Sequence, residues 1–163
     1  MLSEKAKVLQ PLGGRTMLAH IVQKANLTAD QLTLVVGFDM ENVKQELKNV
    51  SIDAACVEQA DQIGTADAVK SALPRIAQTD KILILYGDVP LISKETMENL
   101  FTQQQTTILT TCLDDPSGYG RVLKDENGHA VGIVEEKDAD RTQLLEQEVF
   151  TGVMVVAGEL LHN

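Results

Sequence analysis

The chain has 163 residues, of which 44% are hydrophobic and only 3% are aromatic, and it contains no Trp. Its formal net charge of −10 argues against partners such as nucleic-acid backbones and anionic membranes, which require clustered Lys and Arg. This length suits one domain, residues 1–163, with a core built from Leu, Val, Ile and Ala.

Targeting segments and metal-ligand motifs are not evident in the sequence. No stretch approaches the ~20 consecutive apolar residues of a membrane span, and the N-terminus lacks the apolar core of a signal peptide. The two Cys and three His are scattered without the spacing of a zinc site. We therefore expect a cytoplasmic protein.

Apolar periodicity in the first half predicts alternating helices and strands. Gly13 and Gly14 indicate a turn before the first helix. The pattern predicts helices over 16–25, 40–47 and 65–76, and strands over 32–36 and 52–57.

The second half begins with the most apolar strand, predicted over 81–86. Ser93 is a plausible N-cap for a helix through Leu100. Asn127-Gly128 indicates a β-hairpin. The pattern further predicts strands over 107–113, 121–123, 130–134 and 152–156, and a polar helix over 138–147.

Strands that alternate with helices of about ten residues predict βαβ units, so we expect an α/β domain with a mainly parallel sheet and a late β-hairpin. Doubly wound domains usually begin with a strand, and their ligand loop follows it. This chain instead opens on Ser3-Glu4-Lys5 and continues into a loop and a helix. We therefore expect the first strand of the fold to be missing.

Ligands in open α/β sheets bind beyond the carboxyl ends of the strands. Gly64 and Thr65 follow one strand and open a helix, where they are suited either to bind a base or phosphate or simply to cap the helix. Asp88 follows the most buried strand beside Gly87, a position suited to Mg²⁺, although a turn Asp before Pro90 is also common.

Three further stretches carry candidate residues. Gly118 and Gly120 permit close backbone approach to a ligand, but they also suit an ordinary turn. Glu135 lies in a charged cluster that is either a solvated face or an acceptor for sugar hydroxyls. Lys7 precedes Val8-Leu9 and is the cation placed to meet a phosphate early in the fold.

In order along the chain, five motifs together resemble one enzyme family. They are Lys7-Val8-Leu9-x-Pro11-Leu12-x-Gly14-x-x-Met17, Gln59-x-x-Gln62-x-Gly64-Thr65, Leu85-Tyr86-Gly87-Asp88-Val89-Pro90-Leu91, Asp114-Asp115-Pro116-Ser117-Gly118-Tyr119-Gly120-Arg121, and Gly132-Ile133-Val134-Glu135-Glu136-Lys137-Asp138-Ala139. Over nearly its whole length the chain resembles the uridyltransferase domain of the bacterial bifunctional N-acetylglucosamine-1-phosphate uridyltransferase/glucosamine-1-phosphate acetyltransferase.

The resemblance implies a Rossmann-like domain that condenses UTP with N-acetylglucosamine-1-phosphate to UDP-N-acetylglucosamine, a cell-wall precursor, and releases pyrophosphate. It also implies that Asp88 holds Mg²⁺ and that Lys7 neutralises phosphate oxygens. Uracil recognition falls to Gln59, Gly64 and Thr65, and the sugar site to Tyr86, Gly120 and Glu135. Full-length family members are homotrimers.

The chain also departs from the family pattern. The opening strand, its glycine-rich loop and the C-terminal acetyltransferase domain are absent. Asp67 stands where a His is common, and Phe150 stands where an Asn is expected. Two alternatives therefore remain beside the uridyltransferase: a catalytically incomplete fragment of that enzyme, and a nucleotidyltransferase for another sugar phosphate.

Overall fold

The computed structural model describes residues 5–61 and 63–162. The first half of the chain contains α1 (Met17–Ala25), α2 (Met40–Asn49), α3 (Thr65–Ala72) and the strands β1 (Pro11–Leu12), β2 (Arg15–Thr16), β3 (Thr33–Val36) and β4 (Ala55–Glu58). The second half contains α4 (Lys94–Thr102), α5 (Gly158–Leu161) and the strands β5 (Lys81–Ile84), β6 (Thr107–Cys112), β7 (Arg121–Lys124), β8 (Ala130–Val134) and β9 (Glu148–Ala157). Four 3₁₀ turns complete the set: η1 (Lys7–Leu9), η2 (Leu73–Arg75), η3 (Glu136–Asp138) and η4 (Gln143–Leu145).

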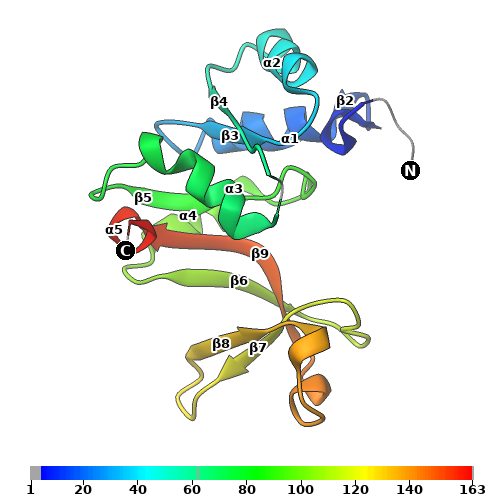
Figure 1. The fold of residues 1–163 in the computed structure, drawn as a ribbon, viewed down its shortest axis with the longest axis vertical. Coiled ribbons are helices and arrows are strands. Elements are labelled where there is room, and N and C mark those ends of the chain that lie inside the picture. The colour runs from blue at the N-terminus through cyan, green and yellow to red at the C-terminus, as the bar shows by residue number, and fades with distance from the viewer. Residues whose placement is uncertain (1–4, 62, 163) are drawn as a thin grey trace.

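The strands form three sheets (Figure 1). Strands β1 and β2 are a short antiparallel hairpin, and β3 pairs in parallel with β4. The largest sheet has the order β5-β9-β7-β8, with β6 also paired to β9, and all of its pairings are antiparallel. Strand β9 is the long central element of this sheet because it pairs with β5, β6 and β7 in turn.

Two clusters of buried aliphatic side chains join the helices to one another and to the large sheet. In the first cluster, Leu18, Ile21 and Val22 on one face of α1 pack with Val43 and Leu47 of α2. The second cluster joins Leu100 of α4 to Val153 and Val155 of β9. Burying each such side chain contributes about 1.5–3 kcal/mol, so the apolar helix faces determine where the helices lie.

Side-chain hydroxyls cap the starts of α1 and α4, and the sequence predicts the second of these caps, Ser93. The Thr16 hydroxyl accepts a hydrogen bond from the Ala19 amide at 3.0 Å, and the Ser93 hydroxyl accepts one from the Thr96 amide at 3.0 Å. Each hydroxyl satisfies a backbone donor that has no partner within the helix. The predicted starts of α1 and α4 are confirmed.

The predicted polar helix over 138–147 is wrong. This segment contains only the turns η3 and η4. The carboxylate of Asp140 accepts hydrogen bonds from the amides of Thr142 and Gln143 at 2.8 and 2.9 Å, which favours a local turn over a helix. Leu145 remains 78% exposed, so the segment has no buried apolar face to stabilise a helix.

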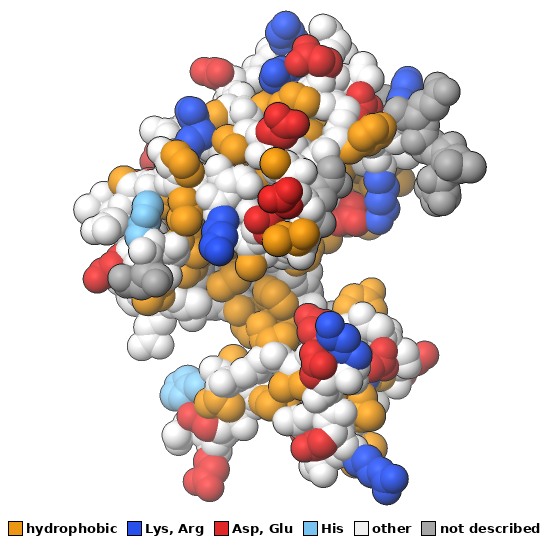
Figure 2. Space-filling view, in the orientation of Figure 1, with side chains coloured by type: hydrophobic (Ala, Val, Ile, Leu, Met, Phe, Trp, Pro, Cys, Tyr) orange, Lys and Arg blue, Asp and Glu red, His pale blue; other side chains and the backbone are white. Residues whose placement is uncertain are grey.

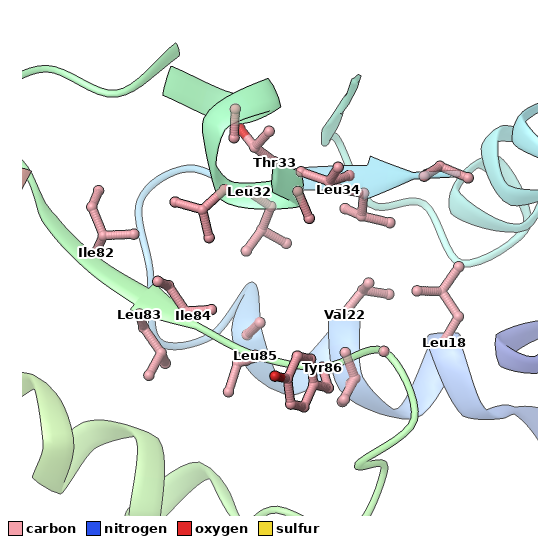
Figure 3. Close-up of a pocket in the computed structure, with 18 of the residues that line it drawn as sticks. Leu18, Val22, Leu32, Thr33, Leu34, Ile82, Leu83, Ile84, Leu85 and Tyr86 are labelled. Atoms are coloured by element: carbon pink, nitrogen blue, oxygen red, sulfur yellow. The ribbon is translucent and has the colours of Figure 1, made fainter. Parts of the chain in front are cut away.

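The predicted α/β fold class is confirmed. The parallel strands β3 and β4 form a sheet separate from the one that contains β5. Strand β5 runs in the same direction as β3 but does not pair with it (Figure 3). Within residues 5–61 and 63–162, a cavity of about 620 Å³ separates them, and no strand lies between them. None of the described helices is long and apolar enough to cross a membrane.

Glu148 at the start of β9 makes the large sheet sensitive to pH. Its carboxylate lies 2.5 Å from the Lys124 ammonium and accepts a hydrogen bond from the Thr110 hydroxyl at 2.6 Å. These contacts, with Lys124 first, lower the pKa of Glu148 below its usual 4.5. A lowered folded-state pKa means that the stabilisation is present above pH 4.5 and is lost as the pH falls through the folded pKa.

We therefore expect Glu148→Gln to flatten the acid limb of the pH–stability curve. At pH 7 the loss of unfolding free energy stays below about 1 kcal/mol because the ion pair is partly exposed to solvent. Urea unfolding at several pH values between neutrality and the acid limb measures this difference. Parallel curves for the two proteins would show that Glu148 does not contribute to the pH dependence.

Candidate active site

Lys7 and Asp88 meet at the carboxyl end of β5. The Lys7 ammonium lies 2.7 Å from the Asp88 carboxylate, although the two residues are 81 positions apart in sequence. Their side chains are 67% and 39% exposed, so both are accessible to a ligand. The hydrogen bond and charge of Asp88 raise the pKa of Lys7 above its usual value. Lys7 is therefore fully cationic at neutral pH and placed to meet an anion.

Helix α1 anchors the segment that carries Asp88. Lys24 donates hydrogen bonds to the carbonyl oxygens of Pro90 at 2.9 Å and Ile92 at 2.8 Å. Gly87 allows the chain to pass Val8, since a Cβ on Gly87 would lie 2.8 Å from the Val8 side chain. No local pattern in the sequence identifies Lys24, because its partners lie 66 and 68 positions away along the chain.

Gln59 lies between the end of β4 and the start of α3. Its side-chain nitrogen donates to the Gly64 carbonyl oxygen at 2.9 Å and to the Asp67 carboxylate at 3.0 Å. Both partners are acceptors, and this fixes which end of the amide faces them. The Gln59 oxygen is therefore directed away from both partners as a hydrogen-bond acceptor.

Tyr86 links α3 to strand β9. Its hydroxyl lies 3.1 Å from the Thr65 hydroxyl, so Thr65 contacts a side chain beyond its own helix. The Tyr86 ring also lies against Gly152, where a Cβ would approach Tyr86 Cε2 to 1.8 Å. Gly152 has a φ of +85°, a conformation that favours glycine. Gly152 thus provides the space that fixes the ring, a role the sequence analysis did not find.

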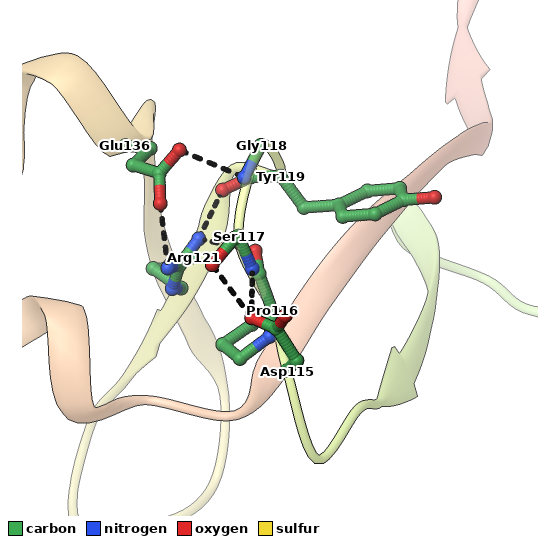
Figure 4. Close-up of polar contacts among 7 residues, drawn as sticks. All are labelled: Asp115, Pro116, Ser117, Gly118, Tyr119, Arg121 and Glu136. Carbon is green, nitrogen blue, oxygen red and sulfur yellow. Dashed lines mark hydrogen bonds and ion pairs between the residues drawn. The ribbon is translucent and has the colours of Figure 1, made fainter.

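The loop before β7 is organised by a buried arginine (Figure 4). The Arg121 side chain is 3% exposed and donates hydrogen bonds to the carbonyl oxygens of Pro116, at 2.8 Å, and of Tyr119. It also pairs with Glu136 at 3.5 Å, and Glu136 accepts from the Gly118 amide at 2.7 Å. Arg121 and Glu136 therefore hold the loop in shape, at a stretch where the sequence left open whether the glycines approach a ligand or form an ordinary turn.

Gly120 and Glu135 lie together where the β7–β8 hairpin meets β9. A Cβ on Gly120 would lie 3.0 Å from the Ile133 side chain and 3.6 Å from the Glu135 carboxylate. The Gly120 carbonyl oxygen accepts a hydrogen bond from the Phe150 amide at 3.0 Å. Phe150 is two residues before Gly152, so β9 connects this pair to Tyr86.

The structure thus brings the predicted residues into two groups. Lys7, Gln59, Thr65 and Tyr86 line the 620 Å³ cavity, and Asp88 joins them through Lys7. Gly120 and Glu135 do not line this cavity and are connected to it through β9. On the face shown in Figure 2, acidic and basic side chains are interspersed.

Asp88 is the carboxylate for which the sequence predicts a divalent cation. In the part of the chain that the structure describes, no group of three or more His, Cys, Asp or Glu side chains forms a metal cage. Mg²⁺ commonly uses only one or two protein carboxylates and takes its other ligands from substrate phosphates and water. One accessible Asp beside a Lys therefore fits a cation that arrives with a phosphorylated substrate.

Comparison with known proteins identifies the family of the chain. The MobA-like NTP transferase domain matches residues 2–149. The bifunctional protein GlmU of Cellvibrio japonicus is 44% identical over 167 aligned residues, which cover 100% of this chain and 36% of the relative. GlmU of Neisseria meningitidis (strain Z2491) is 43% identical and is matched over 96% of this chain and 34% of the relative. The chain thus spans about a third of the length of these curated relatives.

Solved structures show the same fold. A CMP:2-keto-3-deoxy-manno-octonic acid synthetase complexed with CTP gives a TM-score of 0.71 at 16% identity, covering 96% of this chain and 69% of that one. An apo-UDP-glucose pyrophosphorylase gives a TM-score of 0.75 at 12% identity, covering 96% and 70%. The family match extends over most of the chain, and the fold agrees with it. The chain belongs to the MobA-like NTP transferase domain family.

Proposed function

We propose that this chain is the uridyltransferase part of a GlmU-type enzyme, which joins UTP to N-acetylglucosamine-1-phosphate and releases pyrophosphate. The main support is the 44% identity to GlmU along the entire chain, which falls in the N-terminal uridyltransferase region of that protein. The product would be UDP-N-acetylglucosamine, a cell-wall precursor made in the cytoplasm.

The chemistry requires positioning and charge neutralisation rather than a protein nucleophile. An oxygen of the sugar phosphate attacks the α-phosphorus of UTP, a new phosphorus–oxygen bond forms, and the bond to the β-phosphate breaks. Lys7 neutralises phosphate oxygens, for which it must leave the Asp88 carboxylate that it contacts at 2.7 Å. Asp88 would hold Mg²⁺, which supplies further neutralisation of phosphate charge when bound.

The orientation of Gln59 favours uracil over cytosine. Uracil carries an N–H at ring position 3, whereas cytosine has only an acceptor there. Gly64 and Asp67 hold its nitrogen end, so the Gln59 oxygen is directed away from both as an acceptor. We place the base beside Gln59, Gly64 and Thr65, and the sugar beside Tyr86, Gly120 and Glu135.

The base-binding part of the proposal is tested without catalysis. We expect UTP to bind with about tenfold or greater preference over CTP, a difference of roughly 1.4 kcal/mol. Titrations with each nucleotide, followed by the amide NMR signals of Gly64 and Thr65, measure this ratio. Gln59→Leu removes the proposed acceptor, so we expect this variant to lose most of the preference. Equal affinities in the unsubstituted chain would contradict this base assignment.

One observation favours a second candidate function. Within the described residues, a cavity separates the edges of β3 and β5, and four proposed site residues line this cavity. An incomplete site of this kind is consistent with a fragment that binds substrates without turning them over. Nucleotide binding without pyrophosphate release would favour this alternative.

A further inference from the structure

Asp39 has a backbone conformation that is unusual for the start of a helix. It is the N-cap of α2, yet its φ of 64° and ψ of 37° are left-handed, and its side chain caps none of the α2 amides. N-cap residues normally have extended dihedral angles and accept a hydrogen bond from their own helix. A left-handed residue other than glycine costs free energy, so contacts elsewhere must hold Asp39 in this conformation.

Ser51 is the other described non-glycine residue with a positive φ, and the end of a helix explains it. The Ser51 amide donates to the Lys48 carbonyl oxygen at 3.1 Å, and the Ile52 amide donates to that of Leu47 at 3.0 Å. These two bonds form the Schellman motif that closes α2, in which a left-handed residue is normal. This motif belongs to helix ends, so the conformation of Asp39 at a helix start needs a different explanation.

The carboxylate of Asp39 holds the N-terminal segment instead of its own helix. Its Oδ2 accepts a hydrogen bond at 3.1 Å from the amide of Ala6, which is 33 positions away along the chain. Its Oδ1 accepts one from the Asn42 side chain at 2.6 Å, which orients the carboxylate. The left-handed conformation thus directs the side chain to the residue that precedes Lys7.

The backbone of Lys7 lies between two fixed points. On one side Asp39 holds Ala6, and on the other side Val8 packs against the aliphatic cluster of α1 and α2. The Lys7 side chain is itself 67% exposed. Because solvent surrounds most of this side chain, the position of its backbone decides whether the ammonium reaches the candidate site.

We propose that Asp39 is a positioning residue for Lys7: its hydrogen bond to the Ala6 amide fixes the backbone from which the ammonium meets the phosphate oxygens of the substrate. The inference rests on the proposed function, in which Lys7 exchanges Asp88 for a phosphate. With the backbone already fixed, only the side chain has to move, so less conformational freedom is lost when the anion binds. Asp39 acts through Ala6 and Lys7 rather than on the substrate.

Two variants of Asp39 separate this role from the effect of its charge. Asp39→Gly adopts a positive φ readily but has no acceptor for the Ala6 amide. Asp39→Asn keeps an oxygen for that amide and tolerates the left-handed conformation, and the exposed Asn42 amide can turn to pair with it. Both variants remove one negative charge. A purely electrostatic role therefore predicts that both bind a polyphosphate anion more tightly than the unsubstituted chain does.

The first measurement is amide hydrogen exchange without any ligand, followed by NMR. The amides of Leu9 and Gln10 close η1 by donating to the carbonyl oxygens of Ala6 and Lys7. We expect these two amides to exchange about tenfold faster in Asp39→Gly, because the segment opens locally more often. Asp39→Asn should exchange at the original rate. Both variants should unfold close to the original midpoint, since neither adds backbone strain at this position.

The second measurement is the affinity for tripolyphosphate in the presence of Mg²⁺, determined by calorimetry. This probe contains neither base nor sugar. We expect about tenfold weaker binding by Asp39→Gly and no weakening by Asp39→Asn, because only the glycine leaves the Lys7 backbone to be ordered on binding. In a Lys7→Met background, Asp39→Gly should cause no further loss, since the effect passes through Lys7.

The inference is overturned by unchanged exchange or tighter anion binding in Asp39→Gly, by an equal loss in the Lys7→Met background, or by failure of the unsubstituted chain to bind the anion. Neither measurement requires turnover. A chain that shows the expected pattern but releases no pyrophosphate would therefore contradict the proposed function and leave the role of Asp39 standing.

Discussion

Replacement of Gly152 by Ala is expected to destabilise the protein more than any other single methyl addition to a left-handed glycine. The new Cβ would lie 1.8 Å from Tyr86 Cε2 and 2.4 Å from Cδ2, on a backbone with φ of +85°. Backbone strain and overpacking each cost about 1–3 kcal/mol, so we expect a loss of roughly 2–6 kcal/mol. Urea unfolding measures this loss, which is large against a typical total stability of about 5–15 kcal/mol.

Gly128→Ala is the matched control. Gly128 has φ of +82° in the β7–β8 turn, but a Cβ there meets no heavy atom within 4 Å. Only the conformational cost of about 1–2 kcal/mol applies. Placing Gly152→Ala in a Tyr86→Ala background removes the clash, so the double variant should cost less than the sum of the two single variants. Equal losses for Gly152→Ala and Gly128→Ala would refute the packing argument.

The second large effect is expected from Arg121→Met. This substitution keeps an apolar stem but removes the donors to the carbonyl oxygens of Pro116 and Tyr119, together with the Glu136 pair. We expect a loss of about 2–4 kcal/mol, because buried groups lose their partners. The loop over 114–120 should also become sensitive to limited proteolysis, which a gel-based time course measures.

Glu136→Gln separates charge from hydrogen bonding at the same loop. Glutamine retains an oxygen that accepts from the Gly118 amide. Glu136 is 42% exposed in its side chain, so loss of its charge costs less than about 1 kcal/mol. If Arg121→Met proves no less stable or more cleavable than Glu136→Gln, then the buried guanidinium does not hold the loop.

Local signals allowed much of the fold to be predicted from the sequence. Ser93 indicates a helix start because a hydroxyl that caps a helix acts within three residues of itself. Gly128 predicts the β7–β8 hairpin because the turn needs a residue with positive φ, here +82°, which is also a local requirement. The helix predicted over 138–147 is wrong because Asp140 accepts backbone amides in a local turn and Leu145 stays exposed, so the segment buries no apolar face.

The contacts of the candidate site were harder to predict because they join distant parts of the chain. Neither Tyr86 nor Gly152 reveals in sequence that one provides room for the other. The Arg in Gly118-Tyr119-Gly120-Arg121 was interpreted together with its glycines, whereas its burial depends on how β7 packs against β9. By contrast, the predicted strand ends were enough to expect Asp88 and Thr65 at the edge of the sheet, because topology alone determines that position.

Pyrophosphate release from UTP, N-acetylglucosamine-1-phosphate and Mg²⁺ tests the proposed activity most directly. The account predicts release that requires all three components and falls about a hundredfold or more in Asp88→Ala, since removal of one charge-stabilising group typically costs about 10²–10³ in rate. Chelation of Mg²⁺ by EDTA should have the same effect. Release that is unchanged in Asp88→Ala, or no release from the unsubstituted chain, would contradict the account, and the second result would identify the chain as an incomplete uridyltransferase.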